Sequence, residues 1–225
     1  MSARGALLEL KDVSKSYLGP SCAVPVLRHV HLAVEAGEFV IVTGPSGSGK
    51  TTLLNLAGLL DEPTEGEVWF DGCAASRMPE AERAALRAAK IGMVFQKFCL
   101  LSHRSALENV LFRFRYMPAA GRDTLRAAES ALARAGLESV RDRPARLLSQ
   151  GEMQRVAIAR AVVAPPALLL ADEPTGNLDS ESAHIVMATI AELHRGGLTV
   201  LLVTHNPALL AFATRRVVCS NGAVR

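Results

Sequence analysis

The sequence lacks several features that would place it in a particular class of protein. Its four cysteines lie far apart and form no C-x-x-C pair, which gives no sign of a disulfide framework or a zinc site (Cys22, Cys73, Cys99 and Cys219). The first residues contain no apolar signal-peptide core, and no apolar run reaches the roughly 18 residues of a membrane span. We therefore expect reduced thiols and a chain that neither crosses a membrane nor is exported by a signal peptide.

The charge balance and the composition exclude little more. A net charge of +3 over 225 residues is too small to indicate a nucleic-acid partner by itself. The chain contains no internal repeat and no low-complexity tract. Its hydrophobic content of 49%, with both signs of charge mixed along the chain, predicts one globular unit with a substantial core.

The hydrophobic pattern predicts an α/β fold. Apolar and polar residues alternate from Leu7 to Tyr17 and from Val24 to Val34, which predicts an antiparallel edge sheet. Continuous apolar runs predict strands that are buried on both faces, at Phe39–Val42, Ile91–Phe95, Leu168–Ala171 and Thr199–Val203. Helical patterns occur in the stretch TTLLNLAGLL after Lys50 and at Pro79–Lys90, Glu152–Val163 and Ser180–His194. Strands that alternate with helices predict an open, mainly parallel sheet.

The stretch from Ser105 to Arg146 has a different character. Its pattern is helical and rich in arginine, and Pro118 and Gly121 are expected to separate two helices. We interpret this stretch as a helical insertion in the α/β core, not as a separate domain connected by a linker.

One glycine-rich loop indicates phosphate binding. The residues GPSGSGKT, Gly44–Thr51, match the pattern G-x-x-x-x-G-K-[ST] between a predicted strand and a predicted helix. Glycines let backbone N–H groups surround phosphates without an intervening Cβ, while Lys50 supplies a charge and Thr51 a hydroxyl ligand for Mg²⁺. A glycine-rich turn that matches by chance is the alternative, which the flanking strand and helix disfavour. The candidate nucleotide-binding residues here are Gly44, Pro45, Ser46, Gly47, Ser48, Gly49, Lys50, Thr51 and Thr52.

Two acidic residues follow a later strand. In LLLADEP, Asp172 and Glu173 come at the carboxyl end of an apolar run, the end at which open α/β sheets bind ligands. Asp172 is a candidate Mg²⁺ ligand, and Glu173 is a candidate general base for an attacking water. Two acids that merely end a strand are the alternative, which is weakened by the presence of the lysine loop in the same chain.

A second candidate anion site lies in LLSQGEMQRVAIAR, Leu147–Arg160. Ser149 and Gly151 stand where a predicted helix begins, and such helix starts bind anions. Because one subunit does not need two sites for one phosphate, this loop is suited to a nucleotide held by another copy of the chain. An ordinary capped helix explains the same residues, and the residues alone leave both interpretations open.

The order of these motifs resembles a known family. GPSGSGKT, Gln96 in MVFQKF, LSQGE, LLLADEP, NLD and His205 in LLVTHN occur as in the nucleotide-binding subunits of ABC transporters. The resemblance covers essentially the whole chain. It implies a P-loop NTPase (RecA-like) core with an antiparallel β edge subdomain and an inserted α-helical subdomain. We expect a single domain over residues 1–225, with a core at about 1–96 and 152–225 and a helical insertion at about 97–151.

The resemblance also implies roles for individual residues. Two copies would close head to tail, with each ATP between the glycine loop of one and Ser149, Gln150 and Gly151 of the other. Gln96 would contact Mg²⁺ and the attacking water, although a polar residue that merely ends a strand is the alternative. His205 would contact the γ-phosphate, although a lone histidine is more often structural. Asp179 would cross the dimer interface, and Tyr17 would stack on adenine. The implied catalytic residues are Glu173, His205 and Gln96, the implied metal ligands are Thr51, Gln96 and Asp172, and the implied cofactors are ATP and Mg²⁺.

One residue departs from the family pattern. The signature commonly reads LSGGQ or LSGGE, and this chain has Gln150 in place of its first glycine. Ser149 and Gly151 are retained, so we expect closure to survive. A side chain now borders the phosphate path, and we expect Gln150 to slow turnover.

Two further stretches narrow the resemblance to one subgroup of the family. FQKFCLLSHRSALENV and TGNLD resemble the subgroup that serves lipoprotein release, macrolide export and cell division. In place of the usual proline-leucine stretch, residues Leu111–Pro118, LFRFRYMP, alternate basic and aromatic side chains. That alternation suggests nucleic acid, but on a helix it makes no single face. We therefore favour a partly buried surface helix near the place where a membrane partner docks.

The implied function is that of an ATP-hydrolysing engine. It would act on a separate integral membrane permease or mechanotransmission subunit in lipoprotein release or export. The chain would then lie peripherally on the cytoplasmic face of the inner (plasma) membrane, with a second copy of itself as a partner and no nucleic acid. Two alternatives are a soluble ABC-type ATPase that acts on nucleic acid or ribosomes, and a scaffold in a cell-division complex.

Overall fold

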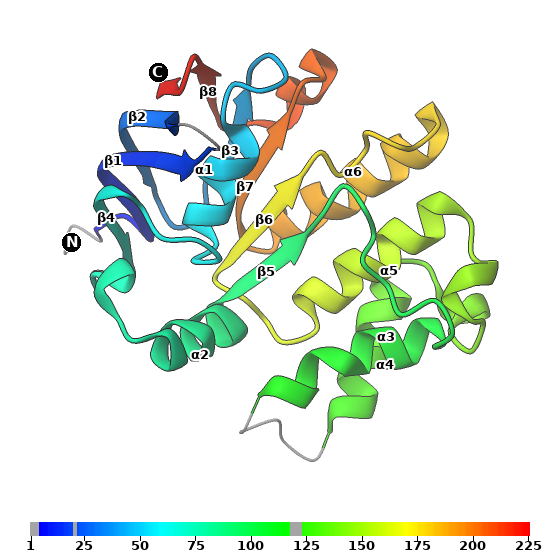
Figure 1. The fold of residues 1–225 in the computed structure, drawn as a ribbon. Helices are drawn as coiled ribbons and strands as arrows, with labels where there is room; N and C mark the ends of the chain where they lie inside the picture. The colour runs from blue at the N-terminus through cyan, green and yellow to red at the C-terminus, as the bar shows by residue number, and fades with distance from the viewer. Residues whose placement is uncertain (1–4, 20–21, 118–122) are drawn as a thin grey trace. The chain divides into compact units, whose positions relative to one another are not determined.

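The computed structural model describes residues 5–19, 22–117 and 123–225 (Figure 1). The chain divides into two compact units. The first unit comprises Met1–Arg87 and Thr199–Arg225, and the second comprises Ala88–Leu198. The predicted break at Pro118 and Gly121 lies outside the described residues.

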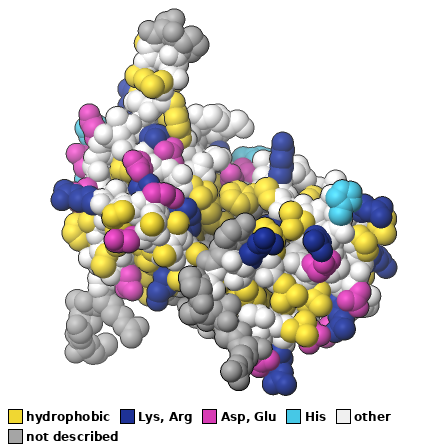
Figure 2. Space-filling model, turned by 60° about the horizontal axis from the view of Figure 1, so that its bottom comes forward, with side chains coloured by type: hydrophobic (Ala, Val, Ile, Leu, Met, Phe, Trp, Pro, Cys, Tyr) yellow, Lys and Arg dark blue, Asp and Glu magenta, His cyan; other side chains and the backbone are white. Residues whose placement is uncertain are grey.

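The surface carries charges of both signs. On the face shown in Figure 2, Lys and Arg side chains are interspersed with Asp and Glu side chains among apolar ones. This mixture agrees with the small net charge of the sequence. Within the described parts of the chain, none of the helices has the length and apolar character needed to span a bilayer.

The first unit contains the predicted antiparallel sheet. Strand β1, Leu8–Leu18, pairs with β2, Ala23–Val34, on one side and with β4, Glu65–Phe70, on the other. Both pairings are antiparallel, which confirms the prediction for the first two strands. Leu8 and Leu10 of β1 are buried, because alternate side chains of the strand face the core. Val13 is also buried, because a register shift between Leu10 and Val13 interrupts the alternation. The third strand, β4, was not predicted.

The first unit also contains parallel strands. Strand β3, Phe39–Thr43, lies between β7, Thr199–Thr204, and β8, Arg215–Ser220, and pairs in parallel with both. The first four residues of β3 are fully buried, as its continuous apolar run predicted. Helix α1, Lys50–Ala57, follows the glycine loop, and a short strand, β9, Ala223–Val224, folds back antiparallel onto β8.

The second unit combines a parallel strand pair with helices. Strand β5, Ile91–Val94, pairs in parallel with β6, Leu168–Asp172, as predicted for two buried apolar runs. Helix α6, Ser180–Arg195, follows β6. Helix α2, Glu80–Lys90, which lies mostly in the first unit, directly precedes β5. Short 3₁₀ helices complete the chain at Ala75–Arg77, Phe112–Tyr116, Glu138–Val140, Ala145–Leu147 and Pro207–Phe212.

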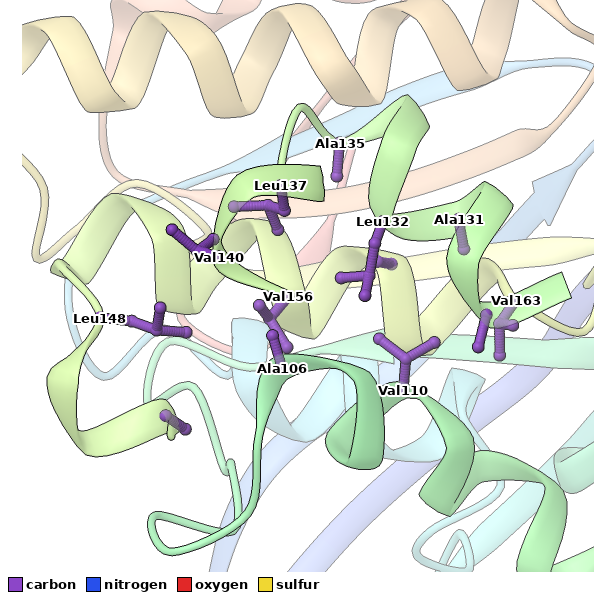
Figure 3. Close-up of a cluster of buried hydrophobic side chains, with 13 residues drawn as sticks. Ala106, Val110, Ala131, Leu132, Ala135, Leu137, Val140, Leu148, Val156 and Val163 are labelled. Atoms are coloured by element: carbon purple, nitrogen blue, oxygen red, sulfur yellow. The ribbon is translucent and has the colours of Figure 1, made fainter. Parts of the chain in front are cut away.

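A separate hydrophobic cluster holds the helical part of the second unit together. It joins α3, Ala106–Leu111, α4, Thr124–Arg134, and α5, Gln150–Val162. Figure 3 shows side chains of α3 and α4 converging on Val156 of α5. Val156 is fully buried in this cluster, so the helix that carries the signature motif is an integral part of it.

The arginine-aromatic stretch forms a 3₁₀ helix in place of an α-helix. Arg113 is partly buried and donates to the Ala88 and Ile91 carbonyls at 2.7 Å each. Burial lowers the pKa of Arg113, and the charge of Arg160 adds to this effect. Phe114 packs against the helical cluster. The described part of the stretch is therefore partly buried, as predicted, and Pro118 lies outside the described residues.

Candidate functional site

The glycine loop of the first unit connects β3 to α1. A Cβ added at Gly44 would lie 2.0 Å from the Cys219 carbonyl oxygen, so only glycine fits there. Gly49 has φ +104°, a left-handed conformation that glycine adopts without strain. Helix α1 begins at the next residue, so its free N–H groups face the loop.

The polar groups of this loop fit an anionic ligand. The Lys50 Nζ atom is buried and donates to the carbonyls of Gly44 and Pro45 at 2.8 and 2.9 Å. The Ser48 hydroxyl is also buried, and it has no hydrogen-bond partner within the described residues. An ammonium group and an unsatisfied hydroxyl beside a helix N-terminus suit a phosphate group.

Cys219 supports the loop from the neighbouring strand. The Cys219 thiol donates to the Ser48 carbonyl at 3.1 Å, and the Gly222 amide donates to the same oxygen at 3.3 Å. Burial raises the pKa of the Cys219 thiol, so the sulfur keeps the proton that it donates. Sequence reasoning missed this contact, because nothing in the local pattern connects Cys219 to the loop.

His205 lies next to the glycine loop in the first unit. Thr43 of β3 is paired with Thr204 of β7, and the two strands are parallel. Gly44 and His205 each follow one of these paired residues, so they leave the sheet side by side at its carboxyl edge. The structure thus brings together two predicted site residues that are 161 positions apart in the sequence.

Tyr17 belongs to a small polar group beside α1. Its hydroxyl donates to Asp61 Oδ2 at 2.8 Å, and the Thr52 side chain lowers its pKa, against the larger effect of burial. The Lys15 ammonium donates to Asp61 Oδ1 at 2.6 Å and lies 4.9 Å from the centroid of the Tyr17 ring. Burial raises the pKa of Tyr17, so its phenol remains a hydrogen-bond donor. Sequence reasoning included Tyr17 and Thr52 but not Lys15 or Asp61.

The second unit brings another set of predicted residues together. Val94 of β5 is paired with Ala171 of β6, so Gln96 and the acidic pair Asp172 and Glu173 leave the same edge of the strand pair. The Asn177 amide donates to the Gln96 carbonyl at 3.2 Å, which connects the two loops. Glu173 has φ +45°, an uncommon conformation for a residue with a side chain.

Helix α5 begins at Gln150, two residues earlier than the sequence pattern predicted. Ser149 Oγ accepts from the Glu152 amide at 3.2 Å, and Glu152 Oε2 accepts from the Ser149 amide at 2.7 Å. This reciprocal capping box fixes the helix start. Gly151 therefore lies in the first helical turn and not in the loop that the pattern suggested, while the Gln150 side chain is exposed.

The signature residues lie beside Asp179 in the second unit. A Cβ added at Gly151 would lie 2.7 Å from the Ser182 hydroxyl, so the starts of α5 and α6 are in close contact. Asp179 Oδ1 accepts from the Ser182 amide at 2.9 Å and caps α6. Hydrogen bonds from Ser182 lower the pKa of Asp179, which keeps its carboxylate charged.

These features first define a general class of protein. A glycine loop with a buried lysine, set between a parallel strand and a helix, is the phosphate-binding arrangement of P-loop nucleoside triphosphatases.

Comparisons with known proteins then narrow the class. Residues 27–176 match the family described as ABC transporter. The lipoprotein-releasing system ATP-binding protein LolD of Anaeromyxobacter dehalogenans is 46% identical over 96% of this chain and 92% of its own length. The macrolide export ATP-binding/permease protein MacB of Syntrophobacter fumaroxidans is 45% identical over 97% of this chain, which spans only 31% of that relative.

A solved structure supports the same family. A dimeric post-hydrolysis state of the ATP-binding cassette MJ0796, bound to ADP and Pi, matches with a TM-score of 0.89 and 38% identity. It covers 97% of this chain and 96% of its own length. The chain therefore belongs to the ABC transporter family of ATP-binding subunits. The predicted fold, family and ATPase activity are confirmed.

Proposed function

We propose that this ATPase works as a head-to-tail dimer that drives a separate membrane protein in lipoprotein release or export. The observation that carries the dimer proposal is the start of α5, where Ser149 and Gly151 begin a capped helix next to Asp179. Its free N–H groups suit a phosphate that this unit does not itself hold. A nucleotide bound by the glycine loop of a second copy supplies that phosphate.

The proposal assigns phosphate binding to the first unit. Backbone N–H groups of the glycine loop, other than at Pro45, surround the phosphates, and Lys50 turns from the loop carbonyls to the phosphate oxygens. His205, at the adjacent strand end, contacts the γ-phosphate. Tyr17 presents its ring to the adenine.

The acidic residues of the second unit carry the hydrolytic step. Glu173 accepts a proton from the attacking water, and Gln96 orients that water. Thr51 of the first unit, and separately Asp172 and Gln96 of the second unit, have oxygen atoms of the kind that suits Mg²⁺. When bound, Mg²⁺ neutralises charge on the phosphates.

A groove in the second unit is the proposed docking place for the membrane partner. It has a volume of about 320 Å³, and its lining includes Lys97, Phe98, Arg146 and Met153. Apolar and basic side chains together suit a short amphipathic segment of another protein. Docking there would hold the chain peripherally at the cytoplasmic face of the membrane.

The nucleic-acid alternative is less well supported. Arg113 of the arginine-aromatic stretch is engaged with backbone carbonyls and is partly buried. Side chains of both signs are mixed on the face shown in Figure 2, whereas nucleic-acid binding favours a continuous basic surface. The cell-division scaffold remains a second candidate, because it needs the same ATP-dependent dimer.

Affinity purification tests the proposed partner. The tagged chain is purified from gently solubilised membranes, and the co-purifying proteins are identified by mass spectrometry. We expect a protein with few membrane helices and a long extracytoplasmic segment. A many-spanned permease would contradict the assignment to lipoprotein release or export, and recovery only with ribosomes or nucleic acid would contradict the membrane function.

A further inference from the structure

We propose that Asp61 and Lys15 are positioning residues that hold the Tyr17 ring as the platform for the nucleobase. This inference rests on the proposed function, because it deepens the role given there to Tyr17. The inference adds Asp61 and Lys15 to the nucleotide-binding site, and neither residue belongs to the sequence motifs described above.

The contacts of Asp61 fix the direction of the tyrosine ring. One carboxylate oxygen accepts from the Tyr17 hydroxyl at 2.8 Å, and the other accepts from the Lys15 ammonium at 2.6 Å. Partial burial opposes ionisation of Asp61, but hydrogen bonds from Lys15 and Tyr17 lower its pKa. An ionised carboxylate makes both hydrogen bonds charge-assisted and therefore strong.

Lys15 leaves one face of the ring for a ligand. Its ammonium lies 4.9 Å from the ring centroid, within the range of a cation–π contact. It also donates to the Glu62 carbonyl at 2.7 Å, so its position over the ring is fixed at two further points. Because Tyr17 is 40% exposed, a planar base can stack on the ring face that the ammonium does not cover.

The same group is connected to the phosphate loop. Thr52, whose side chain lowers the pKa of Tyr17 and thus opposes the effect of burial, lies in the first turn of α1 directly after the glycine loop. The ring is therefore held relative to the residues that bind the phosphates. A ligand that has both a base and a triphosphate would contact both parts of this site.

The test separates base binding from phosphate binding. Isothermal titration calorimetry measures the affinity for ATP and for inorganic triphosphate, each with Mg²⁺, in wild type, Asp61→Ala and Tyr17→Phe. We expect each substitution to weaken the binding of ATP about five- to tenfold, the value of roughly one partly exposed hydrogen bond, and to leave the affinity for inorganic triphosphate unchanged. The double variant should lose no more than Asp61→Ala alone, because Tyr17→Phe removes a hydrogen bond that Asp61→Ala has already removed.

Two further variants serve as controls. Asp61→Asn keeps an acceptor for the Tyr17 hydroxyl and should recover part of the ATP affinity. Glu65→Gln removes an exposed carboxylate of β4 that is paired with Ser14 of β1, and it should bind ATP as wild type does.

Three results would overturn the inference. Unchanged ATP affinity in Asp61→Ala would show that Asp61 does not position Tyr17 for the base. Equal weakening of the binding of ATP and of inorganic triphosphate would show that Asp61 only supports the fold. Failure of the wild type to bind either ligand would overturn the proposed function together with this inference. If the wild type binds both ligands, a negative result with the variants counts against this inference alone and leaves the proposed function standing.

Discussion

Gln150 changes the chemistry of the signature at a single position. It is the first residue of α5, and its exposed side chain stands where the family commonly has glycine. In the proposed dimer this side chain borders the phosphate path. Gln150→Gly should therefore raise the ATP turnover rate about twofold or more, a barrier change of roughly 0.4 kcal/mol, and leave the affinity for ATP unchanged. Steady-state ATPase assays and equilibrium nucleotide binding check this, and unchanged or slower turnover would count against it.

Single residues also show where sequence reasoning stops. The glycine loop between a strand and a helix, and the acidic pair at the end of β6, could be placed from the sequence because each belongs to a short local motif. Asp61 could not, since its partner Tyr17 lies 44 positions away. Cys219 contacts a loop residue 171 positions away. Such contacts depend on tertiary packing, which a local pattern does not encode.

At the scale of secondary-structure elements, helices α3 and α5 begin with the same type of serine cap. Ser149 caps α5 and Ser105 caps α3, each in a capping box with the glutamate three residues later. The serine oxygens accept at 3.2 and 3.1 Å, so the caps are nearly identical in geometry. Ser149→Ala and Ser105→Ala should each lower the free energy of unfolding by about 1 kcal/mol. Only Ser149→Ala should also reduce ATPase activity, because only that serine is assigned to the nucleotide.

The comparison of the two variants needs a stability and an activity measurement. Urea denaturation followed by circular dichroism gives the free energy of unfolding, and ATPase activity is measured well below the midpoint of unfolding. Equal losses of activity in both variants would show that Ser149 acts only as a cap, which is the alternative that the residues alone had left open.

The elements differ in how far the sequence predicts them. Strongly periodic or continuous apolar segments, such as β3 and α6, were predicted to within one residue. Strand β8 was not, because it begins with two arginines and only Val217 and Cys219 are buried. The start of α5 was placed two residues late, although the capping box of Ser149 and Glu152 was readable.

On the scale of the whole molecule, each unit carries one set of the proposed site residues. The first unit holds the phosphate loop, His205 and Tyr17, and the second holds the acidic pair and the signature. The family shows that such subunits hydrolyse ATP, and MJ0796 bound to ADP and Pi is dimeric. A shared site in this chain predicts that its oligomeric state depends on bound ATP.

Glu173→Gln makes this dependence measurable. The amide is isosteric with the carboxylate but cannot accept the proton of the attacking water, so hydrolysis should fall at least about 100-fold while ATP stays bound. With ATP and Mg²⁺ the variant should sediment as a dimer in analytical ultracentrifugation, and without nucleotide as a monomer. Adding Lys50→Ala should abolish the dimer, because it removes the charge that holds the phosphates. A Glu173→Gln protein that stays monomeric with saturating ATP would refute the shared site, since each bound nucleotide would then lack its second surface.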